Sequence, residues 1–185
     1  MKTVEDFLNE HPEEISKYNL DPQKLTERDK LRNRCRERSL YLLEQAPKTE
    51  AKLREKLLKS GKYDEEIVNE TMDFLKKYGY VDDQRFAEQL IKQYANSKSV
   101  REIEQKLYQR GVNQGCIKQA IAAFKENEEL SQDSEMKAAK AAIRKKCRNP
   151  EELDADGKRK LYASLMRKGF SYSTVTKALS IDEEY

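Results

Sequence analysis

Three stretches of 17 residues along the chain are similar to one another, and this internal repeat restricts the possible folds more than any other feature. The copies are KLREKLLKSGKYDEEIV at residues 52–68, EIEQKLYQRGVNQGCIK at residues 102–118 and KLYASLMRKGFSYSTVT at residues 160–176. Equivalent positions lie 50 and then 58 residues apart. Such a repeat is typical of proteins built from stacked, similar supersecondary units.

Each copy predicts a helix, a glycine stop and a second helix. In the first copy, Leu53 and Leu57 have the spacing of one helical face, and Gly61 follows where a left-handed cap favours glycine. Gly111 and Gly169 occupy the same place in the other copies. The residues expected to cap the second helices are Asp64, Asn113 and Ser171, with Asp64 displaced by one position. Ser99 and Glu102 form a capping box that opens the second copy.

A further amphipathic stretch precedes each copy, so each unit is predicted to contain three helices. The apolar positions are Leu31, Cys35, Leu42 and Ala46; then Phe86, Leu90 and Tyr94; then Met136, Ala139, Ile143 and Cys147. We therefore predict an all-α fold, a tandem array of three three-helix repeats, elongated and curved. The predicted repeats are residues 34–82, 83–133 and 134–185, after a leader (1–33) with short helical patterns. Glu126–Asp133 and Asn149–Gly157 are predicted to be loop-like connections.

Composition argues against most enzyme and metal-site classes. The chain has one histidine, three widely separated cysteines and neither of the common glycine-rich phosphate-binding patterns, so we expect no catalytic site, cofactor or metal. Converging carboxylates of a hydrolytic enzyme are not indicated, because the acids cluster at helix starts and connections. No stretch is apolar enough to span a membrane or to act as a signal, and we expect a cytoplasmic protein.

The stretch GYVDDQRFAEQLI, residues 79–91, resembles a motif of the RecX family, bacterial modulators of the RecA recombinase. KLREKLLKSG, REIEQKLYQRGV and RKGFSYSTVTKAL match further family segments in the same order and at the same spacing, so the resemblance extends from Arg34 to the end. The chain departs from the family before Arg101, where Ser97–Val100 replace a turn that usually contains glycine. The leader matches no family motif.

The resemblance implies a negative regulator that binds the RecA–DNA filament and inhibits filament growth, recombinase and coprotease activity. Its implied partners are the RecA filament and the DNA inside that filament, with weak binding to DNA alone, and we expect a monomer. The motif residues Gly61, Gly79, Tyr80, Asp82, Asp83, Phe86, Gly111 and Gly169 are interpreted as structural. Gly79 would cap one helix and Asp83 the next, whereas a metal or acid–base role for Asp82 and Asp83 lacks a third ligand nearby.

Positive charge is concentrated in the third repeat, where residues 134–185 have a net charge of +4. Lys137, Lys140, Arg144 and Arg148 are predicted to form a basic ridge beside the apolar stripe of the first helix, with Lys145 close by. A second cluster comprises Lys158, Arg159, Lys160, Arg167 and Lys168, which point in several directions. These residues are candidates for contact with acidic side chains of RecA or with DNA phosphates.

Arg101, Lys106 and Arg110 extend the candidate surface into the second repeat as a possible charged strip. The alternative interpretation of all these cations is that they form ordinary solvated helix faces without a binding role. A general nucleic-acid-binding helical repeat protein that acts without RecA is the alternative function, because it would use the same basic ridge. Most of the tyrosines Tyr41, Tyr78, Tyr94, Tyr108 and Tyr162 are expected in core or edge packing rather than in a platform for stacking bases.

Overall fold

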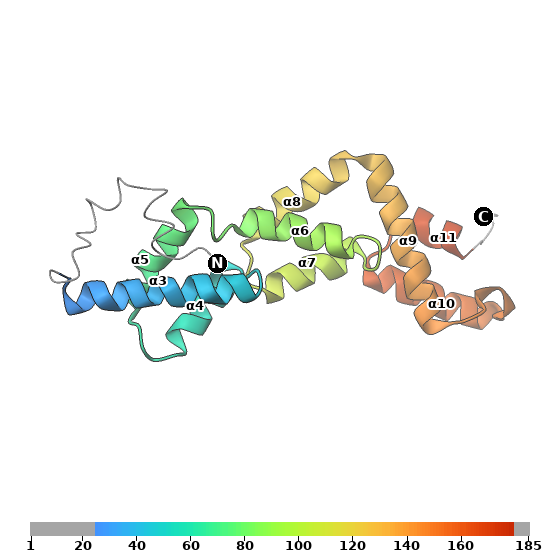
Figure 1. Cartoon of the computed structure of the whole chain (residues 1–185). Coiled ribbons are helices and arrows are strands. Elements are labelled where there is room, and N and C mark those ends of the chain that lie inside the picture. Colours follow the sequence, from blue (N-terminus) through green and yellow to red (C-terminus); the bar gives the residue numbers. More distant parts are fainter. Residues whose placement is uncertain (1–24, 180–185) are drawn as a thin grey trace. The chain divides into compact units, whose positions relative to one another are not determined.

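A computed structural model describes residues 25–179, and all regular structure in that range is helical (Figure 1). The predicted all-α repeat architecture is therefore confirmed. The chain divides into two compact units, Met1–Asp82 and Asp83–Tyr185. Three hydrophobic cores lie within the described residues, one in the first unit and two in the second. Each core corresponds to one of the predicted three-helix repeats.

The described part of the first unit contains α3 (Glu27–Gln45), α4 (Glu50–Leu58) and α5 (Glu65–Lys77). Each helix begins after a side-chain cap, provided by Thr26, Thr49 and Asp64 respectively. The predicted cap at Asp64 is confirmed, because its carboxylate accepts the Ile67 N–H at 2.8 Å. The core of this unit is formed by Cys35, Leu42, Leu53, Leu57, Ile67, Val68, Met72, Phe74, Leu75 and Val81.

The second repeat contains α6 (Asp83–Tyr94), α7 (Val100–Gln109) and α8 (Gln114–Glu126). The predicted capping box is present: Ser99 accepts the Glu102 N–H, and the Glu102 carboxylate accepts the Ser99 N–H. Asn113 caps α8 through the Gly115 N–H, as expected. Ile103, Leu107 and Ile117 are among the fully buried side chains that pack between the three helices.

The third repeat contains α9 (Glu128–Lys146), a 3-10 turn (Pro150–Glu152), α10 (Ala155–Lys168) and α11 (Tyr172–Ala178). The loop predicted at Glu126–Asp133 is wrong, because α9 already begins at Glu128. Asn127 caps this helix, and two glutamates in its first turn interact favourably with the positive end of the helix dipole. The acidic segment is therefore the start of a helix. The loop predicted at Asn149–Gly157 is also too long, since Asp154 caps α10 and Gly157 lies in its first turn.

Two predicted boundaries also fall inside helices. α3 begins at Glu27, within the predicted leader, and α9 crosses the boundary predicted after residue 133. Thr26 and Asp29 form a capping box at the start of α3. This local signal of a helix start lies in a segment without repeat similarity, and the boundary predicted from the repeats therefore missed it. The domain ranges themselves stay predictions. The rest of the predicted leader, residues 1–24, lies outside the described residues, as does the end of the third repeat after residue 179.

Glycine ends helices in both units, as predicted. Gly61, Gly79, Gly111 and Gly169 all have positive φ, between 65° and 89°. After three of them the chain forms the two crossed hydrogen bonds of a Schellman motif, in which the outer bond joins an apolar pair. These outer bonds run from the N–H of Tyr80 to Leu75 O (2.8 Å), of Val112 to Leu107 O (3.1 Å) and of Phe170 to Leu165 O (3.4 Å).

Candidate functional site

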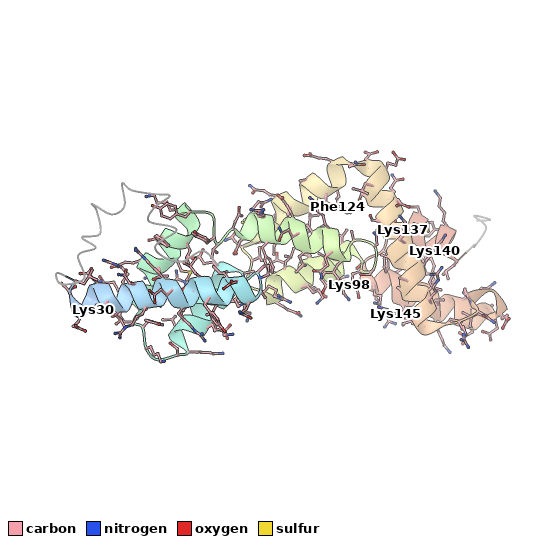
Figure 2. All side chains as sticks on the ribbon, viewed as in Figure 1. Lys30, Lys98, Phe124, Lys137, Lys140 and Lys145 are labelled. Carbon is pink, nitrogen blue, oxygen red and sulfur yellow. The ribbon has the colours of Figure 1, made fainter. Side chains whose placement is uncertain are left out.

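Three cations form a row along the exposed side of α9. At ~100° per residue, Lys137, Lys140 and Arg144 fall within roughly 60° of the helix circumference, and all three are exposed. Figure 2 labels Lys137 and Lys140 on this helix, together with Lys145 nearer its C-terminal end. We call Lys137, Lys140 and Arg144 the basic row. It is the part of the predicted basic ridge that the structure brings together.

The basic row lies on the opposite side of α9 from the core, not beside the apolar stripe as predicted. Met136 and Cys147, taken as stripe positions, are only half-buried. The buried face consists of Ser134, Ala138, Ala139, Ala142 and Ile143. Alanine is small and only weakly apolar, so a helix face built from alanines gives a weak signal in the hydrophobic pattern of the sequence. The buried face of α9 was therefore predicted on the wrong side of the helix. Close packing against α10 and α11 uses those small side chains.

The C-terminal end of α9 removes one predicted member from the row. The helix ends at Lys146 and Cys147 is extended, so Arg148 lies beyond the helix and is not in register with Arg144. Lys145 is exposed on the flank of the helix. Lys146 reaches the hydroxyl of Ser164 on α10 and therefore holds two helices of the third repeat together.

Much of the positive charge at this surface is available to a partner. Lys137 forms an ion pair with Asp133, at 2.6 Å between Nζ and the carboxylate. Lys140, Arg144 and Lys145 have no ion pair with any part of the chain that the structure describes. Exposed cations without internal counter-charges, such as Lys140 and Arg144, attract anions such as carboxylates or phosphates, and release counterions when they bind them.

The cations of α10 do not form one surface, which agrees with the prediction that they point in several directions. Lys160 forms an ion pair with Asp156, at 2.7 Å. Lys168 donates to Glu102 on α7 and is part of the packing between two repeats. Arg159 and Arg167 are exposed, and Lys158 is half-buried.

The strip predicted in the second repeat does not form. Arg101 and Lys106 are five residues apart, which places them ~140° apart on a helix. The side chain of Arg101 lies against Gly169 of the third repeat. The ammonium of Lys106 lies instead over the ring of Tyr94, 5.0 Å from its centroid. Arg110 is exposed at the end of α7.

The contact between α7 and the end of α10 was not foreseen from the sequence. Ser99 Oγ donates to the carbonyl of Lys168, and Lys168 Nζ lies 2.7 Å from Glu102 Oε1. A β-carbon on Gly169 would lie 2.7 Å from that of Arg101, so glycine permits the close approach. No sequence signal links these residues, because they are more than sixty positions apart. They couple the second and third repeats inside one unit.

Glu102 has a lowered pKa at this contact. Burial by itself raises the pKa of this carboxyl, but the hydrogen bond from Lys168 and that from the Ser99 N–H lower it by more. The carboxylate is therefore ionised at neutral pH. Its charge supports both the capping box of α7 and the connection to α10.

The motif residues at Gly79–Phe86 have structural positions. Tyr80 packs against the core of the first unit, and Phe86 is buried in the core of the second repeat. Asp83 is the first residue of α6, so the capping position predicted for it falls one residue earlier, at Asp82. Among residues 25–179, no three His, Cys, Asp or Glu side chains converge where they could hold a metal ion.

The tyrosines are divided between core and surface. Tyr78, Tyr94 and Tyr162 pack against the three cores, as predicted. Tyr41 and Tyr108 are exposed, which the apolar helix spacing did not indicate. Of the three cysteines, Cys35 is buried, whereas Cys116 and Cys147 are half-buried.

The second unit also contains a groove of about 450 Å³ between α6, α8 and α9. Ile91, Ala95, Ala123 and Phe124 supply apolar lining, and Figure 2 labels Phe124 on α8. Leu130 at its edge is 52% exposed. The groove was not predicted, since its lining combines residues from two repeats.

None of the helices in the described residues is long and apolar enough to cross a membrane.

Comparison with known proteins identifies all three repeats. Family models match the first three-helix domain of RecX at residues 35–75, the second at residues 82–121 and the third at residues 133–179. Two crystal structures share the fold. RecX from Lactobacillus salivarius has a TM-score of 0.66 and 19% identity, covering 82% of this chain and 96% of that one. A second regulatory protein RecX has a TM-score of 0.64 and 24% identity, covering 85% and 78%.

Curated relatives carry the same description, regulatory protein RecX. The protein of Clostridium acetobutylicum is 31% identical over 148 residues, covering 78% of this chain and 67% of the relative. That of Clostridioides difficile is 30% identical over 158 residues, covering 82% and 69%. That of Clostridium botulinum is 30% identical over 145 residues, covering 77% and 65%. The matched part of the chain thus spans about two thirds of the length of these relatives.

Proposed function

The chain belongs to the RecX family of regulatory proteins, and from this premise we propose that it is a negative regulator of the RecA recombinase. It binds the RecA–DNA filament in the cytoplasm as a monomer. Binding inhibits filament growth, and with it the recombinase and coprotease activities. The protein acts by occupying the filament rather than by catalysing a reaction.

The basic row of α9 is the observation that supports this proposal most directly. Lys140 and Arg144 project from the side of the helix opposite the core, so a large partner can approach them without disturbing the fold. Neither is neutralised by an ion pair within the described residues. A nucleoprotein filament presents the matching chemistry, because acidic side chains and DNA phosphates both carry negative charge along an extended surface.

Contacts between the second and third repeats hold the helices that carry this surface in place. Ser99, Glu102 and Lys168 connect α7 to α10, and Glu135 connects α9 to α11. A row of cations held on rigid helices retains its geometry when it binds, and less side-chain and backbone order has to be created in the complex. The third repeat is therefore suited to follow a regular array of negative charges.

The first test is the rate of ATP hydrolysis by RecA on single-stranded DNA, measured while this protein is titrated from far below RecA to equal stoichiometry. We expect inhibition well below one protein per RecA subunit, because a regulator of a polymer acts by capping its end or by opening gaps. If ATP hydrolysis is unchanged at an excess of this protein and no complex with the filament forms, the proposed function is wrong.

The double variant Lys140→Glu/Arg144→Glu tests the basic row. Two charge reversals on an exposed face should raise the concentration needed for half inhibition by about tenfold or more, because attraction becomes repulsion. Lys118→Glu/Lys125→Glu is the matched control: both lysines are exposed on α8 and the net charge changes equally. Equal effects of the two double variants would mean that only net charge matters, and would remove the basic row from the mechanism.

The alternative, a nucleic-acid-binding repeat protein that acts without RecA, relies on the same row of cations. It predicts tight binding to bare DNA, with a logarithmic salt dependence of about −0.7 to −0.9 per phosphate contacted. Tight, salt-sensitive binding of DNA together with unchanged ATP hydrolysis by RecA would favour this alternative. The small net charge of +3 argues for weak binding to bare DNA.

A further inference from the structure

Two tyrosines of the third repeat form an exposed aromatic pair that the proposed function does not use. Tyr172 in the first turn of α11 and Tyr162 on α10 meet edge to face, with ring centroids 6.2 Å apart and an interplanar angle of 76°. Tyr172 is 60% exposed, more than any other large hydrophobic or aromatic side chain of the described residues. A T-shaped contact with one neighbour covers only part of the ring, and most of the surface of Tyr172 remains open to solvent.

Tyr162 is held firmly, which gives the pair a fixed position. It packs against the core of the third repeat together with Leu153 and Ala178. The turn between α10 and α11 is closed by the Schellman motif at Gly169, and Ser171 caps α11. Exposed aromatic rings on a rigid turn bind partners at low entropic cost, because few side-chain rotations are lost.

Cations flank the aromatic pair on α10. Lys158 lies four residues before Tyr162 and Arg159 three residues before it, the two spacings that bring side chains together on a helix surface. Arg159 is exposed, and neither cation forms an ion pair with another described residue. Met166, one turn after Tyr162, adds a partly exposed apolar side chain. The surface formed by Lys158, Arg159, Tyr162, Met166 and Tyr172 is called the aromatic patch below.

We propose that the aromatic patch binds single-stranded nucleic acid, with an unpaired base stacked on Tyr172 and the adjoining phosphate held by Arg159 and Lys158. This site goes beyond the proposed function, because it is distinct from the basic row on α9 and needs no RecA. An exposed aromatic ring next to cations without internal ion pairs matches a planar base attached to a charged phosphate.

Two other partners fit the aromatic patch less well. Double-stranded DNA keeps its bases stacked inside the duplex, so it can offer phosphates to Arg159 but no base face to Tyr172. An acidic peptide can bind the cations, but stacking on the exposed ring requires a flat group that most acidic peptides lack. The net charge of +4 of residues 134–185 favours a polyanion.

The test is fluorescence anisotropy of a labelled thymidine oligonucleotide of about 15 nucleotides with the full-length protein, at about 50 mM salt, without RecA. We expect Tyr172→Ala to weaken binding of the single strand by about fivefold or more, whereas Tyr172→Phe binds nearly as wild type because the ring remains. Binding of a duplex of the same length should change by less than about twofold, since it makes no stacking contact.

Two further variants separate stacking from charge and from general effects. Tyr172→Ala should leave the salt dependence unchanged, whereas Arg159→Gln should reduce its slope by about 0.7, the value for one lost phosphate contact on a single strand. Tyr108→Ala is the control, because Tyr108 is 44% exposed on α7 of the second repeat and lies outside the patch. It should bind the oligonucleotide like wild type.

Several results would overturn the proposal. These are a wild-type protein that does not bind the oligonucleotide, a Tyr172→Ala variant whose affinity changes by less than about twofold, equal losses for single strand and duplex, or full displacement of the oligonucleotide by an acidic peptide. Titration of RecA ATP hydrolysis with Tyr172→Ala is a separate measurement. Its outcome concerns the proposed regulatory function and leaves the conclusion on bare DNA unaffected.

Discussion

Gly169 meets two structural requirements with a single residue. Its φ of 89° is unfavourable for residues with a β-carbon, and its α-carbon faces the side chain of Arg101 on the neighbouring repeat. Gly61 has a φ of 65°, but a β-carbon placed there meets nothing within 4 Å. The repeat in the sequence shows both as equivalent glycines. Only the packing of α7 against α10 distinguishes them.

Gly169→Ala should therefore be more destabilising than Gly61→Ala. Left-handed backbone costs an alanine about 1–2 kcal/mol, and at residue 169 the contact with the Arg101 β-carbon adds at least about 1 kcal/mol, because that atom cannot rotate away. Urea denaturation of both variants measures the two free energies of unfolding. Equal losses would mean that the repeats separate easily at this contact.

Lys168→Met tests the ion pair at the same contact and its dependence on pH. The pKa of Glu102 is lowered in the folded protein, so its stabilisation is present above the unfolded value and disappears as the pH falls through the folded value. At neutral pH the variant should lose about 1 kcal/mol of stability, and at acidic pH, below the ordinary glutamate pKa of 4.5, the difference from wild type should shrink as Glu102 becomes protonated. A loss that is the same at both pH values would assign the effect to packing of the lysine chain.

At the scale of the element, Glu135 determines how α11 attaches to α9. One carboxylate oxygen accepts the Ser171 N–H at 2.7 Å, and the other accepts the hydroxyls of Ser171 and Thr174 at 2.9 and 2.8 Å. Thr174 is buried, so its hydroxyl depends on this partner. The short helix α11 is thus fixed through the residues that begin it. Sequence patterns reveal Ser171 as a cap but not its link to a carboxylate 36 residues earlier.

Glu135→Ala should destabilise the second unit by about 1.5–3 kcal/mol, because buried and partly buried donors lose a charged acceptor. Glu129→Ala in the first turn of α9 is the control, and should cost less than about 1 kcal/mol through the helix dipole alone. Thermal and urea unfolding provide the comparison. A loss at residue 135 no larger than that of the control would mean that α11 is held by Val175 and Leu179 alone.

At the scale of the whole molecule, stability is divided among separate cores. Among the described residues, the buried core of the first unit consists of residues between Cys35 and Val81. The second unit contains two cores that Ser99, Glu102 and Lys168 connect. A substitution at that connection should therefore lower the stability of both repeats of the second unit, because both repeats contribute residues to it.

Hydrogen exchange of the Gly169→Ala variant tests this division. Amides of α7, α9, α10 and α11 should exchange faster than in wild type, whereas those of α3, α4 and α5 should keep their protection, because the described buried residues of their core all belong to the first unit. Mass spectrometry of peptides from the two units measures the difference. Faster exchange throughout the chain would mean that the units unfold together.

Local sequence determined the helices, because their signals act within a few residues. The glycine stops, the caps at Asp64, Asn113 and Ser171, and the capping box at Ser99 all follow from hydrogen bonds between near neighbours. The start of α9 was missed because Asn127 and the glutamates after it signal a helix start and an acidic loop equally well. The family resemblance rests on the same local motifs.

Only the tertiary structure decided which face of each helix is buried and which cations remain exposed. An alanine face in α9 is a weak periodic signal, so the packing of α10 and α11 was needed to place Lys140 and Arg144 opposite the core. The sequence predicts Lys168 as a surface cation, whereas the structure places it in an ion pair with Glu102, which is distant in sequence. The pair of Tyr162 and Tyr172 likewise requires the fold of the turn. Contacts between distant residues depend on how helices pack, and packing depends on all the side chains at the interface.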